Sequence, residues 1–305
     1  MKRVTEQLGK VAVLMGGISA ERDVSLVSGK AVLNALQSAG VDAHAVDANP
    51  DNIGTLTEQG FARAFIVLHG RWGEDGVVQG ALEAIGMPYT GSGVLGCALA
   101  MDKVRSKQIW QTLGLPTAKY CVLHNESDLD GLIDDLGLPL FLKPAREGSS
   151  VGIGKVSSQD ELLPVWREAA KVGDAVLAEQ FNAGIELTVA IFNGQALPIV
   201  QMETTNEFYD YQAKYQSDET KYTCPAELDE KLTNQIQSLA LQAFNALDCG
   251  VWGRVDVMLD GQGEPMLLEV NTVPGMTSHS LVPMSAAKYG MDFQQLVLAI
   301  LEETL

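Results

Sequence analysis

Short apolar runs alternate with helix-like stretches along the first part of the chain. The run at 11–15 is continuously apolar and ends at two glycines, and short apolar runs recur at 43–46 and 64–68. Runs of this length predict buried parallel strands. Apolar residues three and four apart follow the first run and predict a helix, and 75–86 predicts another that ends at a glycine. This alternation predicts an open α/β domain over residues 1–92.

The middle of the chain, residues 93–183, mixes helices and strands and predicts an α+β domain. One helix is predicted from about 94 to 113, where a glycine and a proline stop it. The other elements predicted here are strands at 119–123, 139–143 and 176–181 and helices at 126–136 and 159–172.

The pattern from 184 to 305 is strand-rich and predicts a second α+β domain. One amphipathic helix, with an apolar stripe from Leu228 to Leu247, interrupts the strands. A polar, tyrosine-rich stretch at 206–225 shows no steady period, and a connection of this length in a compact domain favours a functional lid. The predicted strands are 186–193, 196–202, 251–259 and 264–271.

Composition and charge restrict the class of protein. The 305 residues carry a formal charge of −18, which argues against nucleic acid or anionic membrane as a partner. No apolar run approaches the ~20 residues of a membrane helix. The four cysteines lie far apart without zinc-ligand spacing, so we expect reduced thiols and a cytoplasmic protein.

The last predicted hairpin gathers charged side chains on one face. Arg254 and Asp256 alternate with apolar residues along one strand, as do Glu269 and Asn271 along the other. A turn at 260–263 would place Arg254 opposite Glu269. Two carboxylates and an amide oxygen are ligands that Mg²⁺ prefers. The residues alone also fit an exposed polar face held by cross-strand ion pairs.

A second candidate site follows the predicted strand that ends near Lys143. The segment 147–154 contains three glycines and two serines, whose N–H groups and hydroxyls can close over a phosphate. A lysine in a buried strand needs an anionic partner. A Walker-type GxxxxGK[ST] motif is absent, and no GxGxxG opens the first helix, which argues against a dinucleotide-dependent oxidoreductase.

Spaced motifs extend over essentially the whole chain, at 16–22, 69–76, 89–93, 101–103, 143–152, 209–215, 253–256, 269–271 and 274–280. Together they resemble the ATP-grasp superfamily and, within it, the D-alanine–D-alanine ligase family. The resemblance implies an ATP-grasp fold, with an open α/β N-terminal domain followed by two α+β domains that clamp ATP. Gln180 and Val251 depart from the lysine and glycine that are common in the family.

The resemblance also implies a reaction. ATP would phosphorylate one D-alanine to D-alanyl phosphate, and the amine of a second D-alanine would displace the phosphate, for peptidoglycan precursor synthesis. ATP would be a substrate, and two Mg²⁺ ions, or Mn²⁺ in their place, would be cofactors. The family further points to a homodimer in the cytoplasm.

Carried over position by position, the resemblance assigns residues to the nucleotide and the metal. Lys103 and Lys143 would hold phosphates under a loop that carries Ser149 and Ser150. Glu179 and the backbone near Phe181 would meet the adenine. The remaining assignments are Glu186 for the ribose, Phe208, Met258 and Leu268 for the rest of the nucleotide site, and Asp256, Glu269 and Asn271 for magnesium.

The first D-alanine would be held mainly by its ammonium group. The resemblance assigns that group to Glu21, linked through Ser149 to Tyr215, and places His69 near the substrate's carboxylate. Both assigned residues of the first domain have simpler interpretations. A carboxylate such as Glu21 in a first helical turn is favourable on its own, and a histidine after a buried strand is more often a satisfied structural residue.

The second D-alanine and the transition state complete the assignment. Ser280 and the Leu281 N–H would hold the second carboxylate, and Arg254 with the Gly275 N–H would stabilise the oxyanion. Lys214, on the predicted lid, would reach the γ-phosphate. The alternatives left open are a ligase that accepts D-lactate or D-serine and a non-catalytic ATP-binding module.

Overall fold

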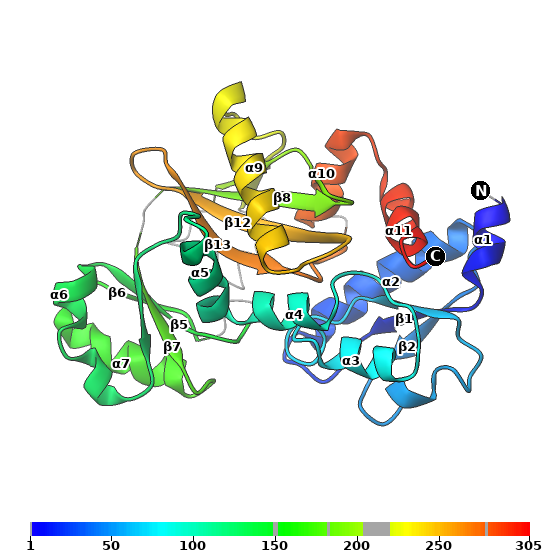
Figure 1. Cartoon of the computed structure of the whole chain (residues 1–305), viewed down its shortest axis with the longest axis horizontal. Helices are drawn as coiled ribbons and strands as arrows, with labels where there is room; N and C mark the ends of the chain where they lie inside the picture. Colours follow the sequence, from blue (N-terminus) through cyan, green and yellow to red (C-terminus); the bar gives the residue numbers. More distant parts are fainter. Residues whose placement is uncertain (1, 149–151, 182–183, 204–219, 278–279) are drawn as a thin grey trace.

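The computed structural model describes residues 2–148, 152–181, 184–203, 220–277 and 280–305, which form three β-sheets. Figure 1 shows the four-stranded sheet at one end of the molecule, the six-stranded sheet in the middle and the three-stranded sheet at the other end. Each sheet falls inside one of the three residue ranges predicted as domains, although the boundaries themselves stay a prediction. The mixed α/β class is confirmed.

The first sheet is parallel, with the strand order β2–β1–β3. All of β1 is buried, as expected for the central strand of a parallel sheet. A Cβ at Gly29 in α2 would lie 2.4 Å from the Met15 Cβ, so this helix packs on β1 only because Gly29 has no side chain. The elements here are β1 (Val11–Met15), α2 (Arg22–Ser38), β2 (Ala43–Asp47), η1 (Ile53–Thr55), β3 (Arg63–Ile66) and α3 (Val77–Ala84).

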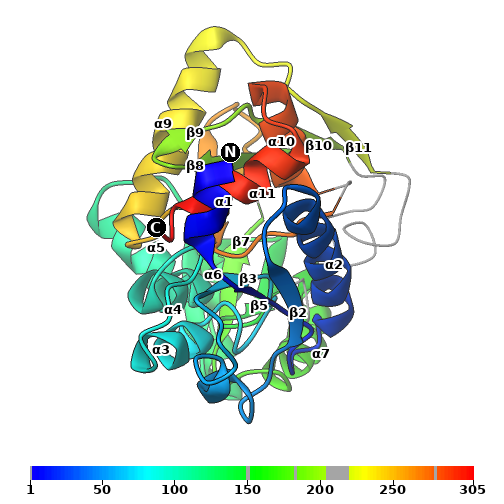
Figure 2. The same ribbon diagram turned by 90° about the vertical axis from the view of Figure 1, so that its right-hand side faces the viewer.

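Helices from both ends of the chain lie beside the first sheet. α1 (Lys2–Leu8), which the pattern did not predict, and α11 (Phe293–Glu302) lie at the same end of the molecule (Figures 1 and 2). α11 packs against α2, and its Leu296 and Ile300 join the core around β1. α10 (Leu281–Tyr289) contacts β8 of the third sheet and therefore bridges the first and last domains.

The second sheet is antiparallel, with the order β4–β7–β5–β6. The single helix predicted at 126–136 is wrong, because Gly131, at φ 75°, separates η2 from α6. α7 packs against β5 and β6. The elements are β4 (Tyr120–Leu123), η2 (Glu126–Leu129), α6 (Leu132–Leu136), β5 (Leu140–Pro144), β6 (Gly154–Val156), α7 (Gln159–Ala170) and β7 (Val176–Gln180).

The continuous helix predicted from 94 to 113 is also wrong, because the helix is interrupted at Asp102. α4 (Val94–Met101) ends there and α5 (Lys103–Thr112) begins. Asp102 has an extended backbone, and its carboxylate accepts a hydrogen bond from the Arg105 N–H at 3.0 Å, which makes it the N-cap of α5. The other Asp102 oxygen accepts from Arg146 Nε at 2.8 Å. The break places a lysine at the first position of α5.

The third sheet has the order β11–β10–β8–β12–β13, with β9 paired to β8. α9 packs on β12 and β13, and residues 221–223 of the predicted lid instead form β11. None of the helices in the described ranges is long and apolar enough to cross a membrane. The elements are β8 (Ile185–Phe192), β9 (Gln195–Ala196), β10 (Val200–Glu203), β11 (Lys221–Thr223), α9 (Glu230–Ala246), β12 (Trp252–Leu259) and β13 (Pro265–Asn271).

The register of the β12–β13 hairpin differs from the prediction by two residues. Arg254 pairs with Asn271 and Asp256 pairs with Glu269, so the predicted pairing of Arg254 with Glu269 is wrong. The turn is one residue longer than predicted, because Leu259 pairs with Pro265, and a bulge adds one more residue to β13. The shift is two residues from Arg254 to Asp256, so the charged side chains keep their predicted face, and it is one residue between the bulge and the turn.

Candidate active site

Lys103 connects the glycine-rich loop to the β12–β13 hairpin. Its side chain is buried at the start of α5. The Lys103 Nζ donates to the Glu147 carbonyl at 2.7 Å and lies 3.2 Å from Glu269 Oε2. Glu147 begins the loop predicted to hold phosphate, and Glu269 is a predicted metal ligand. One buried ammonium group therefore joins the two candidate sites.

A second group of buried charges surrounds Glu179 on β7, which pairs with Phe141 on β5. The buried Glu179 carboxylate contacts Lys143 Nζ through Oε2 and Lys107 Nζ through Oε1. Burial on its own raises the pKa of Glu179, but the two ammonium groups outweigh it and lower this pKa to about 2. Lys143 and Glu179, predicted to contact opposite ends of ATP, therefore bind each other here. Lys107 was not among the predicted site residues.

Asp256 is the centre of the charged cluster on β12. Arg254 donates to both of its oxygens, from Nε and Nη2, each at 2.8 Å. Thr188 Oγ1 on the neighbouring strand β8 donates to Oδ1 at 2.5 Å, and Asn271 Nδ2 donates to Oδ2 at 3.1 Å. The structure thus brings Arg254, Asp256 and Asn271 together beside Glu269. Arg254 offsets the charge of Asp256, and Lys103 offsets that of Glu269.

The Glu21 carboxylate lies where the first domain meets the glycine-rich loop. A Cβ at Gly70 would come within 2.5 Å of Glu21 Oε2, and one at Gly148 within 2.9 Å. Ser19 links the backbone of Glu21 to that of His69, since its Oγ accepts from the Glu21 N–H at 3.1 Å and donates to the His69 carbonyl at 2.6 Å. The two glycines leave room for this carboxylate, and a larger residue at either position would displace it.

Glu74 is a site residue that the sequence interpretation missed. Its carboxylate accepts hydrogen bonds from the Gly70 N–H at 2.5 Å and the Val273 N–H at 3.3 Å, and so joins the first domain to the segment after β13. Burial raises the pKa of Glu74 to about 8, and the charge of Glu21 adds to this shift. Its place in the motif at 69–76 was a signal, but nothing in the spacing indicated that its carboxylate lies close to that of Glu21.

His69 is buried, and both of its ring nitrogens contact the protein. Nδ1 lies 2.9 Å from the Val273 carbonyl, and Nε2 lies 3.3 Å from Ser28 Oγ, which accepts from the Met276 N–H at 3.2 Å. Burial lowers the pKa of His69 to about 4, and the Arg254 charge acts in the same direction. A neutral ring with the proton on Nδ1 satisfies all these partners. His69 and Ser28 therefore position the segment 273–276.

Ser280 and Leu281 begin α10, next to Gly275. Ser280 Oγ accepts from the Thr277 N–H at 2.9 Å, and a Cβ at Gly275 would lie 3.0 Å from the same oxygen. Leu281 is the first residue of the helix, where backbone N–H groups have no intrahelical acceptor and favour an anion. This arrangement suits a substrate carboxylate.

The remaining predicted nucleotide residues are divided between two sheets. Glu186 on β8 pairs with Met258 on β12, and Leu268 lies on β13 at the bulge. The Phe181 N–H, on the backbone predicted to meet the adenine, is bonded to the Pro139 carbonyl at 3.1 Å. The predicted residues that lie outside the described ranges are Ser149, Ser150, Phe208, Lys214 and Tyr215.

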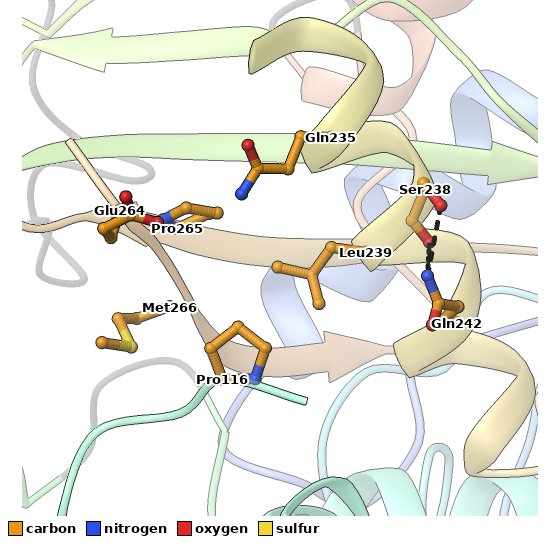
Figure 3. Close-up of a pocket in the computed structure, with 8 residues that line it drawn as sticks. All are labelled: Pro116, Gln235, Ser238, Leu239, Gln242, Glu264, Pro265 and Met266. Carbon is orange, nitrogen blue, oxygen red and sulfur yellow. Dashed lines mark hydrogen bonds between the residues drawn. The ribbon is translucent and has the colours of Figure 1, made fainter. Parts of the chain in front are cut away.

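A hollow of about 440 Å³ lies between α9 and the β12–β13 turn (Figure 3). One of its amides is bonded locally, since Gln242 Nε2 donates to both the carbonyl and the Oγ of Ser238. The hollow contains none of the charged residues gathered at the candidate site. It is lined by Pro116, Gln235, Ser238, Leu239, Gln242, Glu264, Pro265 and Met266.

Two family models match this chain. The model described as D-ala D-ala ligase N-terminus matches residues 53–92, and the one described as D-ala D-ala ligase C-terminus matches residues 109–302. The second match alone includes β4 to α11, and therefore most of the candidate site.

Individual proteins give the same result. A D-alanine–D-alanine ligase from Aromatoleum aromaticum is 54% identical over 300 residues, which are 98% of this chain and 97% of the relative. The D-alanine–D-alanine ligase from Bacillus anthracis complexed with ATP has a TM-score of 0.83 at 33% identity and covers 97% of both chains. The VanG D-Ala:D-Ser ligase from Enterococcus faecalis has a TM-score of 0.84 at 29% identity, over 97% of this chain and 99% of its own.

Proposed function

The chain belongs to the D-alanine–D-alanine ligase family, and we propose that it joins two D-alanines with ATP through a D-alanyl phosphate, for peptidoglycan precursor synthesis. A carboxylate is a poor electrophile, so transfer of the γ-phosphoryl group to the first D-alanine supplies a leaving group. The amine of the second D-alanine then displaces phosphate and forms the peptide bond. ADP and phosphate leave as the other products.

The observation that carries this proposal is the position of the Lys103 ammonium. It contacts the Glu269 carboxylate at 3.2 Å and the Glu147 carbonyl of the glycine-rich loop at 2.7 Å. A phosphate group that entered between loop and hairpin would meet this charge first. In a buried setting such a fixed charge stabilises phosphoryl transfer far more than it would in water.

The β12–β13 hairpin has the donor set that suits magnesium. Asp256, Glu269 and Asn271 would supply two carboxylates and an amide oxygen, and each carboxylate already has a counter-cation in this structure, as expected for groups that meet a cation during function. Bound there, magnesium would neutralise charge on the phosphates of ATP. Arg254 would then lie beside the carboxylate of the first D-alanine.

The substrate residues would act on the two ends of each D-alanine. Glu21 would receive the ammonium of the first D-alanine, and Ser280 with the Leu281 N–H would hold the carboxylate of the second. Arg254 and the Gly275 N–H would stabilise the tetrahedral oxyanion, because both belong to segments that adjoin the cluster on β12. Ser149, Tyr215 and Lys214 complete the proposed site from outside the described residues.

The acceptor is the point at which related enzymes differ. VanG has D-serine in its name and a similar fold, so the fold does not distinguish the acceptor. The relative at 54% identity is named for D-alanine at both positions, which favours D-alanine here. The homodimer and the cytoplasmic location stay predictions, which sedimentation and cell fractionation would test.

The proposed reaction predicts a product that mass spectrometry can identify. With ATP and Mg²⁺, we expect D-alanine to give D-alanyl-D-alanine and phosphate, L-alanine to give neither, and D-serine or D-lactate to compete poorly as second substrate. A mixed product formed in preference to D-alanyl-D-alanine would move the assignment to a sibling ligase. Absence of ATP turnover with every acceptor would support a non-catalytic module instead.

The metal assignment predicts that Glu269→Gln folds normally but turns over at least about 100-fold more slowly at any Mg²⁺ concentration, a loss of about 2.7 kcal/mol of transition-state stabilisation. Glu264→Gln is the matched control, since this exposed carboxylate lies in the turn of the same hairpin. Steady-state rates across a Mg²⁺ titration provide the measurement. Near-normal turnover of the Glu269 variant would contradict the assignment.

A further inference from the structure

Lys107 is a fully buried lysine that the proposed reaction does not yet use. It lies one turn after Lys103 on α5, so the two side chains project from the same face of the helix. The Lys107 Nζ contacts Glu179 Oε1, donates to Thr117 Oγ1 at 2.5 Å and lies 5.7 Å from the centre of the Tyr120 ring. Burying an ammonium group is costly, so its place in the core calls for a reason.

The carboxylate that Lys107 contacts is shared between two cations. Lys107 meets one oxygen of Glu179 and Lys143 meets the other, and Tyr120 is a fourth titratable group close to this set. Two ammonium groups around one carboxylate leave an excess of one positive charge in a buried place. Such an excess favours the entry of an anion, and the triphosphate of ATP is that anion in the proposed reaction.

The two lysines differ in how far they can move. Lys143 retains some exposure and is assigned to phosphate. Lys107 has none, and its anchor is itself fixed, because Thr117 Oγ1 donates to the Leu267 carbonyl at 3.0 Å. When a phosphate attracts Lys143, Lys107 therefore stays with Glu179.

We propose that Lys107 is a positioning residue for adenine recognition, which keeps the Glu179 carboxylate charged and oriented when ATP draws Lys143 to its phosphates. The inference rests on the proposed function, because it takes the adenine role of Glu179 from there. The movement of Lys143 from Glu179 to the phosphates frees Glu179 Oε2, which then accepts a hydrogen bond from the adenine amino group. Oε1 stays in contact with Lys107. Phosphate binding and adenine recognition are thereby coupled through one carboxylate.

Without Lys107, the departure of Lys143 would leave a buried, unpaired carboxylate. Glu179 would then take up a proton, because a buried carboxylate without a partner cation is stable only in its neutral form. A neutral carboxyl group can donate as well as accept a hydrogen bond, so it no longer distinguishes a purine with a 6-amino group from one with a 6-oxo group.

The test compares ATP with inosine triphosphate, which differs from it at this position of the ring. Titration calorimetry on the full chain, in buffers of different ionisation enthalpy, gives both affinities and the protons taken up. Lys107→Met keeps most of the length of the side chain and removes its charge, and Thr117→Val removes the anchor together with its bond to the Leu267 carbonyl. Arg105→Met is the control, because this side chain is exposed on the same helix and bonds Gln108.

We expect Lys107→Met to reduce the preference for ATP over inosine triphosphate about tenfold or more, the size of one hydrogen bond to a charged group. ATP binding should also take up close to one more proton than in the wild type near neutral pH. Thr117→Val should change both quantities in the same direction by less, and it serves alone if Lys107→Met does not fold. An unchanged preference and unchanged proton uptake in the folded variants would overturn the inference.

Glu179→Gln separates this inference from the function on which it rests. A wild type that prefers ATP, with a Glu179→Gln variant that retains the preference, would refute the adenine assignment. A loss of preference in Glu179→Gln but not in the Lys107 and Thr117 variants would refute the positioning role alone. In either case, formation of D-alanyl-D-alanine by the wild type would still support the ligase assignment.

Discussion

Glu74 shows how one residue sets the charge balance of the site. Its carboxylate lies close to that of Glu21, and two ionised carboxylates there would repel each other. Burial raises the pKa of Glu74 and the charge of Glu21 raises it further, so the pair favours a state that carries only one negative charge while no ligand is bound. One negative charge on this pair matches the single positive charge of a substrate ammonium.

This raised pKa predicts a pH dependence of stability. Glu74 titrates near its ordinary 4.5 in the unfolded chain and near 8 in the folded one, so the folded state binds the proton more tightly between these values. Stability of the ligand-free protein should therefore fall as pH rises from about 4.5 to about 8. In Glu74→Gln this fall should be smaller by a few kcal/mol, because each tenfold difference in proton affinity between the two states is worth about 1.4 kcal/mol.

Urea unfolding at several pH values between about 5 and 9 measures the effect. Glu58→Gln, an exposed carboxylate of the same domain, is the matched control and should keep the wild-type profile. Parallel profiles for the wild type and Glu74→Gln would mean that Glu74 is already ionised in the folded protein.

At the scale of elements, the short break between α4 and α5 sets the direction in which Lys103 and Lys107 project. Asp102 caps α5 through one oxygen and holds Arg146, next to the glycine-rich loop, through the other. Lys103 and Lys107 then follow on one face of the helix. The direction of α5 therefore decides where both ammonium groups meet their carboxylates.

Asp102→Ala should consequently lower stability by about 1 kcal/mol, the usual cost of losing an N-cap, and weaken ATP binding severalfold. Asp102→Asn is the informative comparison, because its amide oxygen can still cap the helix but cannot pair with Arg146 as a charge. We expect it to retain most of the stability. Thermal unfolding and ATP titration distinguish the two effects, and equal ATP affinity in wild type and Asp102→Ala would disprove the aiming role.

The elements also show what the sequence could and could not predict. Apolar periodicity located the strands and the faces of the β12–β13 hairpin, because both depend on local alternation. It missed the break at Asp102, since an apolar helix pattern continues across it, and it missed the bulge, which depends on tertiary pairing. Val251, at φ 61°, explains why glycine is common there in the family.

Contacts distant in sequence were the least predictable part of the candidate site. Lys107 and Glu179 are 72 positions apart by their numbers, and Glu74 meets Val273 across two domains. A lone lysine in a helix pattern is ordinarily a solvent-facing residue, so nothing local marks Lys107. The motifs of the resemblance identified the chemistry, while the pairing of charges required the fold.

At the scale of the whole molecule, one buried arginine joins the two ends of the chain to the first sheet. Arg63 on β3 donates from Nε to the Leu8 carbonyl at 2.6 Å, from Nη1 to the carbonyl and Oγ1 of Thr304 at 2.8 and 2.7 Å, and from Nη2 to the Gln7 carbonyl at 3.2 Å. α11 thus returns from the third domain and packs on α2, whose N-terminus carries Glu21.

Arg63→Met should therefore lower the free energy of unfolding by about 3 kcal/mol, because several buried carbonyls lose a charged donor at once. Thr304→Val removes part of the same set and should cost about 1 kcal/mol. Hydrogen exchange monitored by mass spectrometry should quicken in α1 and α11 in both variants, while β4 to β7, in a separate core, keep their protection. Unchanged exchange in α11 would show that apolar packing on α2 alone holds the C-terminal helix, and that Arg63 serves only the N-terminal one.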